Sequence, residues 1–436
     1  MESIWKGGLT RETRWRVTLI AAIGFLAIIG PAITLTKGLP SIRPEEILLF
    51  GVFGINFVIC IWRRLKDKDY FIIEREEWNP LLRDIHRGFL LLVLVVIVSD
   101  IWGVLALGVR LSFRDLMEFV TFFKYYLILT LVGNIEWDKR VFRMVLYGLS
   151  AGVLLDLLFT YLQSYNFADI NNRFVPLIAP EVSVSNLLGY PVRTIGTLSN
   201  PNFNAMLLVM GLVLIVCSFY FQRLPRLTQG ALIILFALMM KGMMMNISRM
   251  AILATALAFS YVSIRFWLNI GWKKELFIKI GIIFACTVLI WYTAPRSFTA
   301  RMHEATNFNT STSIMGHFNR WSLAIDNIKV SPVLGWGSAK GEMSTLVDNE
   351  YLLVMRRYGI PGIILYSGLF FTAFKRAHDL SRQGTINYFG VALEGITLGI
   401  LLLNLNAGIF YQLQLMSVYC ILTGLVYALC WKEGYS

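Results

Sequence analysis

Apolar runs of about 20 residues recur along almost the whole chain of 436 residues. A run of this length is what an α-helix needs to cross the hydrocarbon core of a bilayer. The composition agrees, because 56% of the residues are hydrophobic and only 15% are charged, whereas soluble domains carry about 25% charged residues. Since lipid tolerates no open sheet edge, the pattern predicts an all-α polytopic membrane protein.

The apolar runs predict about 12 transmembrane helices, with one large loop between the ninth and the tenth. The predicted spans cover residues 17–35, 47–62, 88–109, 115–131, 141–162, 203–221, 230–245, 249–264, 276–292, 351–374, 389–405 and 410–431. We therefore divide the chain into residues 1–162 with helices 1–5, residues 163–293 with helices 6–9, the loop 294–350, and residues 351–436 with helices 10–12.

The formal net charge of +13 has two interpretations. A basic excess can mark nucleic-acid binding, but in a membrane protein Lys and Arg concentrate in the cytoplasmic loops. We favour the second and expect no nucleic-acid partner. With a cytoplasmic N-terminus, the inner segments hold about twice as many Lys and Arg residues as the outer segments. This bias places both termini in the cytoplasm and the loop 294–350 on the outer face.

The cysteines and histidines give no sign of a metal site. No cluster of them has the spacing of metal ligands, and no phosphate-binding P-loop occurs, so we expect neither a metal nor a cofactor. The five cysteines fall inside or beside apolar runs, where they behave as small hydrophobic residues. These are Cys60, Cys217, Cys286, Cys420 and Cys430.

Arginines are frequent near the outer membrane surface. The planar guanidinium group binds two phosphate oxygens at once, so arginines from separate segments at one surface suit a diphosphate carried on a lipid. The alternative is that they reach headgroups and anchor the spans. The set consists of Arg173, Arg193, Arg249, Arg296, Arg301 and Arg320.

Three residues of the large loop are candidates for proton transfer. Asp348 precedes an apolar span, so it is either the N-cap of that helix or a general base that reaches a sugar hydroxyl. Glu350 is a weaker candidate for the same base. His317 is either a solvated loop residue or a donor to phosphate or to the leaving group.

Charged residues inside predicted spans are costly and usually functional. Asp100, Glu118 and Lys124 are of this kind. We predict that Lys124 pairs with Glu118 or Asp100 between the third and fourth spans.

Short motifs between residues 190 and 365 resemble, in their order and in their topology, the O-antigen ligase and O-antigen polymerase family of bacterial envelope assembly. The motifs are Gly196-x-x-x-Asn200-Pro201-Asn202, Ser248-Arg249, Arg320-Trp321, Pro332-x-x-Gly335-x-Gly337, Asp348-Asn349-x-Tyr351-Leu352 and Tyr358-Gly359-Ile360-x-Gly362.

The resemblance implies a GT-C type glycosyltransferase of the bacterial inner membrane, with the loop 294–350 as a periplasmic catalytic loop. It implies a glycan on undecaprenyl diphosphate as donor, no metal and no cofactor, and membrane lipid and a chain-length regulator as further partners. Arg193 and Arg249 match the diphosphate-binding arginines by position, and Arg320 is a further candidate. We add Arg173 and Arg301 as candidate diphosphate ligands, and we predict Asp348, Arg320, His317 and Glu350 as the catalytic set.

The residue before Asn349 is histidine in typical ligases of this family, where it serves as the proposed base, whereas here it is Asp348. This difference favours a polymerase, which transfers glycan to the end of another lipid-linked repeat unit with inversion. The first alternative is a ligase that transfers the polymer to lipid A–core. The second alternative is a secondary transporter, although the internal repeats typical of transporters are not apparent in the sequence.

Overall fold

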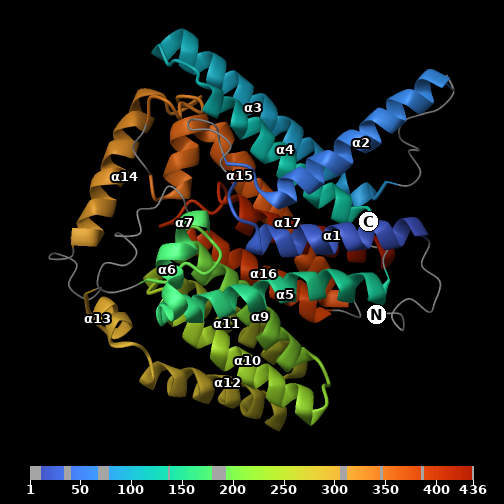
Figure 1. Ribbon diagram of the computed structural model, residues 1–436, viewed down its shortest axis with the longest axis vertical. Helices are drawn as coiled ribbons and strands as arrows, with labels where there is room; N and C mark the ends of the chain where they lie inside the picture. The colour runs from blue at the N-terminus through green and yellow to red at the C-terminus, as the bar shows by residue number, and fades with distance from the viewer. Residues whose placement is uncertain are drawn as a thin grey trace.

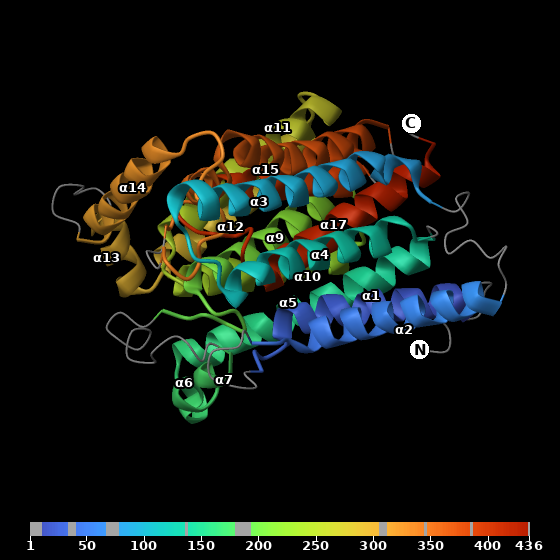
Figure 2. The same ribbon diagram turned by 90° about the horizontal axis from the view of Figure 1, so that it is seen from above.

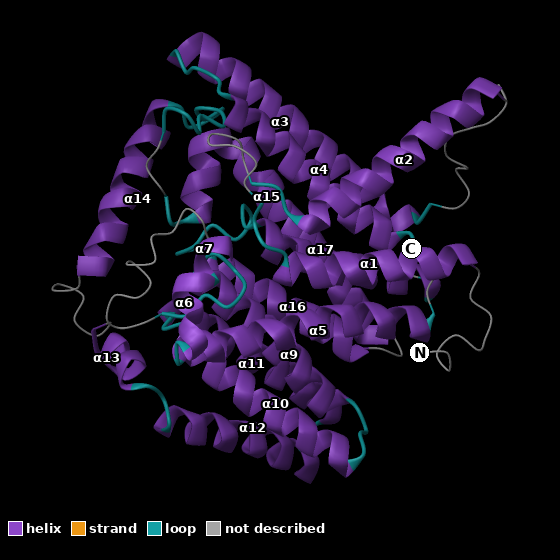
Figure 3. Cartoon of the chain, viewed as in Figure 1, coloured by secondary structure: helices purple, strands orange, loops and turns teal. Residues whose placement is uncertain are grey.

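The structure is a computed structural model that describes residues 11–33, 41–66, 78–135, 138–178, 193–304, 312–343, 347–383 and 387–434. Within these ranges the regular secondary structure is helical, and a single isolated bridge joins Ile33 and Ile42. The prediction of an all-α protein is therefore confirmed (Figure 3).

Each predicted span overlaps a long helix. The long helices are α1 (Arg11–Ile29), α2 (Pro44–Lys66), α3 (Arg83–Leu107), α4 (Phe113–Gly133), α5 (Lys139–Ser164), α9 (Pro201–Phe221), α10 (Arg226–Met245), α11 (Arg249–Ile270), α12 (Lys274–Tyr292), α15 (Glu350–Gln383), α16 (Asn387–Leu403) and α17 (Leu413–Lys432). The other helices include α6 (Ile170–Arg173), α7 (Val175–Ile178), α13 (Arg296–Glu304) and α14 (Thr312–Val330).

Eight helices in the described part of the chain are long and apolar enough to cross a membrane, which makes this a multi-pass membrane protein. They are α3, α4, α5, α9, α10, α11, α12 and α17. The remaining four spans, which correspond to α1, α2, α15 and α16, stay predictions. Within its described residues, the large loop contains two helices, α13 and α14.

The long helices lie side by side in one bundle (Figure 2). α17 and α9 form its centre, with 94% and 78% of their most apolar stretches buried, whereas α12 is only 17% buried and lies at the edge (Figure 1). α2 diverges from the bundle, and α14 stands at one end of it (Figure 1). Helices that are apolar all round fill the interior, and the outer ones expose large side chains such as Leu90 and Leu105 on α3, as a lipid-facing surface requires.

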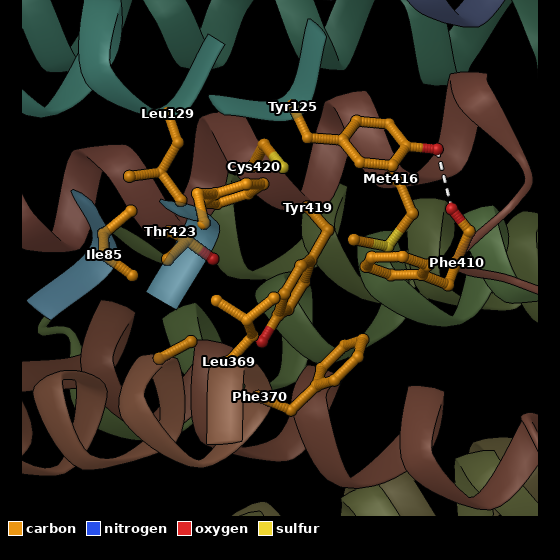
Figure 4. Close-up of a pocket in the computed structure, with 12 residues that line it drawn as sticks. Ile85, Tyr125, Leu129, Leu369, Phe370, Phe410, Met416, Tyr419, Cys420 and Thr423 are labelled. Atoms are coloured by element: carbon orange, nitrogen blue, oxygen red, sulfur yellow. Dashed lines mark hydrogen bonds between the residues drawn. The ribbon is translucent and has the colours of Figure 1, made fainter. Parts of the chain in front are cut away.

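The centre of the bundle holds a small apolar cavity of about 30 Å³ between α3, α4, α15 and α17 (Figure 4). Its lining is aromatic and aliphatic, and the hydroxyl of Tyr125 donates to the carbonyl of Phe410 at 2.7 Å. A space of this size with a mainly apolar lining is an ordinary packing defect of a protein interior. The functional site therefore lies elsewhere.

The buried Lys124 of α4 does not pair as predicted. Its Nζ lies 3.2 Å from Oε1 of Glu45 and 3.0 Å from Oε1 of Glu46, both in the first turn of α2. The prediction of a pair with Glu118 or Asp100 was wrong, because Lys124 lies on the face of α4 that meets α2. This ion pair attaches the first turn of the diverging helix α2 to α4 and so to the bundle.

Candidate active site

An arginine-lined cavity of about 120 Å³ lies where six segments of the chain meet. Its lining comes from the non-helical segment before α9, the first turns of α9 and α11, the helices α13 and α14, and the turn between α16 and α17. The residues around it are Arg193, Asn202, Ile247, Ser248, Arg249, Met250, Arg301, His317 and Asn406. The structure thus brings together three of the four predicted diphosphate ligands.

Arg193 is held by a buried polar network. Its Nε donates to the carbonyl of Asn246 at 3.2 Å, and its Nη2 donates to Oδ1 of Asn202 at 3.4 Å. The following residues fold onto α5, where Oδ1 of Asp156 accepts from the backbone N–H of Thr197 at 2.7 Å. The carboxylate of Asp156 also accepts from the side-chain amide of Asn204 at 2.7 Å.

Gly196 is the first residue of the motif Gly196-x-x-x-Asn200-Pro201-Asn202, and the structure explains why glycine is needed there. Its φ is +57°, and a Cβ atom at this position would lie 2.2 Å from Oδ1 of Asp156. A residue with a side chain would displace the segment that carries Arg193. Asp156 is an ionisable residue inside a predicted span, so the rule that selected Asp100 and Glu118 applied to it too.

Two helices begin at the cavity. Asn200 caps α9 by accepting from the N–H of Asn202 at 2.8 Å, with Pro201 at the first helical position. Ser248 caps α11 by accepting from the N–H of Ala251 at 3.3 Å. The N-terminus of a helix carries a partial positive charge and favours an anion, so both helices add to the charge of the arginines.

The electrostatics of the cavity are strongly positive. Burial, with the neighbouring charges of Arg301 and Arg249, lowers the pKa of Arg193 to about 10. Arg193 therefore remains a cation at neutral pH, in surroundings that disfavour its charge. A bound anion would offset the free-energy cost of keeping this charge in buried surroundings. Two or three forked guanidinium groups also match the oxygens of a phosphate or diphosphate.

Asp348 lies beside the cavity with two of its predicted partners. Its Oδ2 is 2.8 Å from Nδ1 of His317 and 2.5 Å from Nη2 of Arg320. Nη2 of Arg320 also lies 3.4 Å from Nδ1 of His317. All three side chains are partly exposed, so the cluster is accessible from outside. His317 also lines the cavity, and it joins the acidic group to the arginines.

The N-cap of α15 is Asn349. Its Oδ1 accepts from the N–H of Leu352 at 3.1 Å, which is the hydrogen bond of an N-cap. The cap interpretation of Asp348 was therefore wrong, because the side chain of Asp348 turns to α14.

We expect Asn349→Ala to lower the free energy of unfolding by about 1 kcal/mol, since the first turn of α15 loses its cap. Asp348→Ala should lower it by less, because its partly exposed ion pair contributes little to stability. Thermal unfolding of the purified variants in one detergent measures both effects. A larger loss of stability in Asp348→Ala would restore the cap interpretation.

The large loop is anchored to a break in α15. At Gly359 the backbone leaves the helical region with φ 61° and ψ −155°. The carbonyls of Arg356 and Arg357 accept instead from the N–H groups of Trp336 and Gly337, at 2.9 and 2.8 Å. The motif that ends at Gly337 thus binds the residues just before the motif that begins at Tyr358, through backbone groups that a break would otherwise leave unsatisfied.

Two buried acidic residues hold the same loop from α3 and α4. Oδ1 of Asp100 accepts from the N–H of Ser338 at 2.6 Å. Glu118 pairs with Nη1 of Arg357 at 3.0 Å and also contacts Nζ of Lys340 and the hydroxyl of Tyr358. These charges inside spans therefore fasten the loop and the first half of α15 to the bundle.

Two predicted site residues lie apart from this cluster. Arg173 is exposed on α6 and does not line the cavity. Glu350 is fully buried, and its Oε2 accepts from the N–H of Phe410 at 3.2 Å, in the turn between α16 and α17. Conversely, the cavity residues Asn202 and Asn406 were not predicted to bind a ligand. Asn202 belongs to a motif that pointed to this place, whereas Asn406 carries no signal in the sequence.

Fold and site define a multi-pass helical membrane protein with a cationic cavity beside an Asp–His–Arg cluster. Residues 234–367 match the family model of the O-antigen ligase, and this match supports assignment of the chain to the O-antigen ligase/polymerase family. The matched part contains Arg249, Arg301, His317, Arg320 and Asp348, whereas Arg193 lies before it. No curated protein is similar enough to the chain to count as a relative.

Proposed function

We propose that the protein is an O-antigen polymerase. It transfers a glycan from undecaprenyl diphosphate to the end of another lipid-linked repeat unit. The observation that carries the proposal is the cavity in which Arg193, Arg249 and Arg301 converge with the N-termini of α9 and α11. Such a site binds a diphosphate and stabilises the negative charge that develops on it as the glycan leaves.

The chemistry follows from this arrangement. Guanidinium groups and helix N-termini supply the charge that a metal ion supplies in other phosphate sites, so the proposed transfer is metal-independent. The acceptor hydroxyl attacks the anomeric carbon on the side opposite the diphosphate, which inverts the configuration. A basic group beside the cavity takes the proton of the acceptor hydroxyl, and the cluster around Asp348 supplies that group.

We place the site on the periplasmic face of the bacterial inner membrane, with both termini in the cytoplasm. The bias of Lys and Arg residues toward the inner segments supports this orientation. A membrane-embedded site gives a lipid-linked donor access from the bilayer. A chain-length regulator remains a predicted partner.

A ligase is the alternative, and the matching family model supports it equally. Both activities use the same donor and differ in the acceptor, so the cavity serves either. We favour the polymerase because an aspartate precedes Asn349.

Deletion of the gene tests the function. The lipopolysaccharide of a deletion strain that carries core plus a single repeat unit identifies a polymerase. Bare core together with accumulated lipid-linked polymer identifies a ligase and contradicts our choice. An unchanged ladder would falsify both activities and favour a transporter.

The anion site has a direct test with inorganic pyrophosphate as the probe. We expect pyrophosphate to raise the thermal unfolding midpoint of the purified protein. Arg193→Ala or Arg249→Ala should weaken its binding by about 10- to 100-fold, because each variant loses a charge-assisted hydrogen-bonding group. Arg296→Ala is the matched control, since Arg296 is exposed on α13 and does not line the cavity. Equal binding by the wild type and all three variants would place the phosphate elsewhere.

A further inference from the structure

The residue that joins the cluster of Asp348 to the cavity is His317. It lines the cavity with Arg193, Arg249 and Arg301, and its Nδ1 lies 2.8 Å from Oδ2 of Asp348. Asp348 is not among the cavity-lining residues. The imidazole of His317 therefore lies next to the cavity, and the carboxylate of Asp348 lies behind it.

We propose that His317 is the base that removes the proton from the acceptor hydroxyl, and that Asp348 is a positioning residue that acts through it. The inference rests on the proposed function and names its proton acceptor. It reverses the roles that the sequence alone favoured, in which Asp348 is the base.

The hydrogen bonds determine which ring nitrogen reacts. We assign the ring proton to Nδ1, because the carboxylate of Asp348 can only accept and lies at 2.8 Å, nearer than the competing donor Nη2 of Arg320 at 3.4 Å. Nε2 is then the unprotonated nitrogen with a lone pair, and it is the atom of the ring that can accept a proton. Oδ2 of Asp348 is already in contact with Nδ1 of His317 and Nη2 of Arg320, and the carboxylate is not among the groups that line the cavity.

The charges around His317 come from every segment that meets it. Arg320 lies on its own helix, Asp348 precedes α15, and the three cavity arginines lie on the segment before α9, on α11 and on α13. The arginines and Arg320 are cations, and Asp348 is the acidic group in contact with the imidazole. When the donor diphosphate neutralises them, Asp348 stabilises the imidazolium that forms during transfer.

The step balances as follows. The acceptor oxygen forms a bond to the anomeric carbon, and its proton moves to Nε2 of His317. The bond between the anomeric carbon and the phosphate oxygen breaks, and its electron pair leaves with the diphosphate. The imidazolium then returns its proton to water, and no oxidant, reductant or further reactant is needed.

Kinetics of glycan transfer test the assignment. The purified protein is reconstituted in lipid vesicles with lipid-linked oligosaccharide extracted from the strain of origin, and the rate is measured across the pH range. We expect His317→Gln to lower kcat at least about 100-fold, with little change in KM for the donor. In the wild type the rate should fall in acid, and this acid limb should be absent from the residual rate of His317→Gln.

Asp348→Asn should lower kcat and move the acid limb of the rate to lower pH, because the imidazolium loses its stabilising charge. The double variant His317→Gln/Asp348→Asn should be no slower than His317→Gln, since Asp348 acts only through His317. The assignment is overturned if the effects of the two substitutions multiply. It is also overturned if the acid limb lies near pH ~4, where a carboxylate titrates, and persists in His317→Gln.

Two controls distinguish a failure of this inference from a failure of the proposed function. Asp326→Asn changes an exposed aspartate on the same helix that pairs with Lys329, and it should leave kcat unchanged. His317→Gln should still bind inorganic pyrophosphate, which shows that the fold and the cavity are intact. If pyrophosphate stabilises neither protein and no glycan is transferred, the proposed function fails. If both proteins bind pyrophosphate and transfer glycan equally fast, only the inference fails.

Discussion

We expect Gly359→Ala to lower the free energy of unfolding by more than about 4 kcal/mol. With φ 61° and ψ −155°, this residue occupies a region that only glycine adopts easily. A Cβ atom here would lie 2.0 Å from the carbonyl oxygen of Val333, which is backbone and cannot rotate away. The segment around Val333 cannot move away either, because the carbonyl of Pro332 accepts a hydrogen bond from the N–H of Ile360.

Gly368→Ala is the matched control for this substitution. Gly368 lies in the same helix, and a Cβ atom there would meet no other atom within 4 Å. Alanine is the better helix former by about 1 kcal/mol, so this variant should be as stable as the wild type or slightly more stable. Thermal unfolding in one detergent compares the two, and equal stability would refute the joint between the loop and the break in α15.

The second large effect concerns the buried carboxylate of Glu118. We expect Glu118→Ala to lower the free energy of unfolding by about 3 to 5 kcal/mol, because it leaves Arg357 and Lys340 without their shared partner. Removing one member of a buried ion pair costs far more than the pair itself contributes. Glycan transfer should fall as well, since the loop beside the site loses its attachment to α4.

The matched control is Glu275→Ala. Glu275 pairs with Lys279 at 2.9 Å, but it is 57% exposed at the start of α12. A pair of this kind contributes about 0 to 1 kcal/mol. If both substitutions reduced the unfolding midpoint equally, the ion-pair network around Glu118 would not be an anchor of the loop.

Much of the architecture could be predicted from the sequence. The length of the apolar runs located the long helices, because crossing a bilayer sets a minimum number of residues. The predicted spans beginning at residues 203 and 249 lie close to the starts of α9 and α11, which Asn200 and Ser248 cap. His317 and Arg320 are three residues apart, a spacing that places them on one face of α14.

The tertiary structure decided which of these pieces meet. No feature of the neighbouring sequence distinguishes Arg301, which lines the cavity, from Arg173, which lies exposed on α6. Asp348 and Asn349 are neighbours, yet one turns to His317 and the other caps α15. Helix spans and caps depend on residues close in sequence, whose energies the sequence itself specifies. The pairing of Lys124 with α2, the converging arginines and the imidazole beside Asp348 depend instead on which helix faces pack together, and packing decides that.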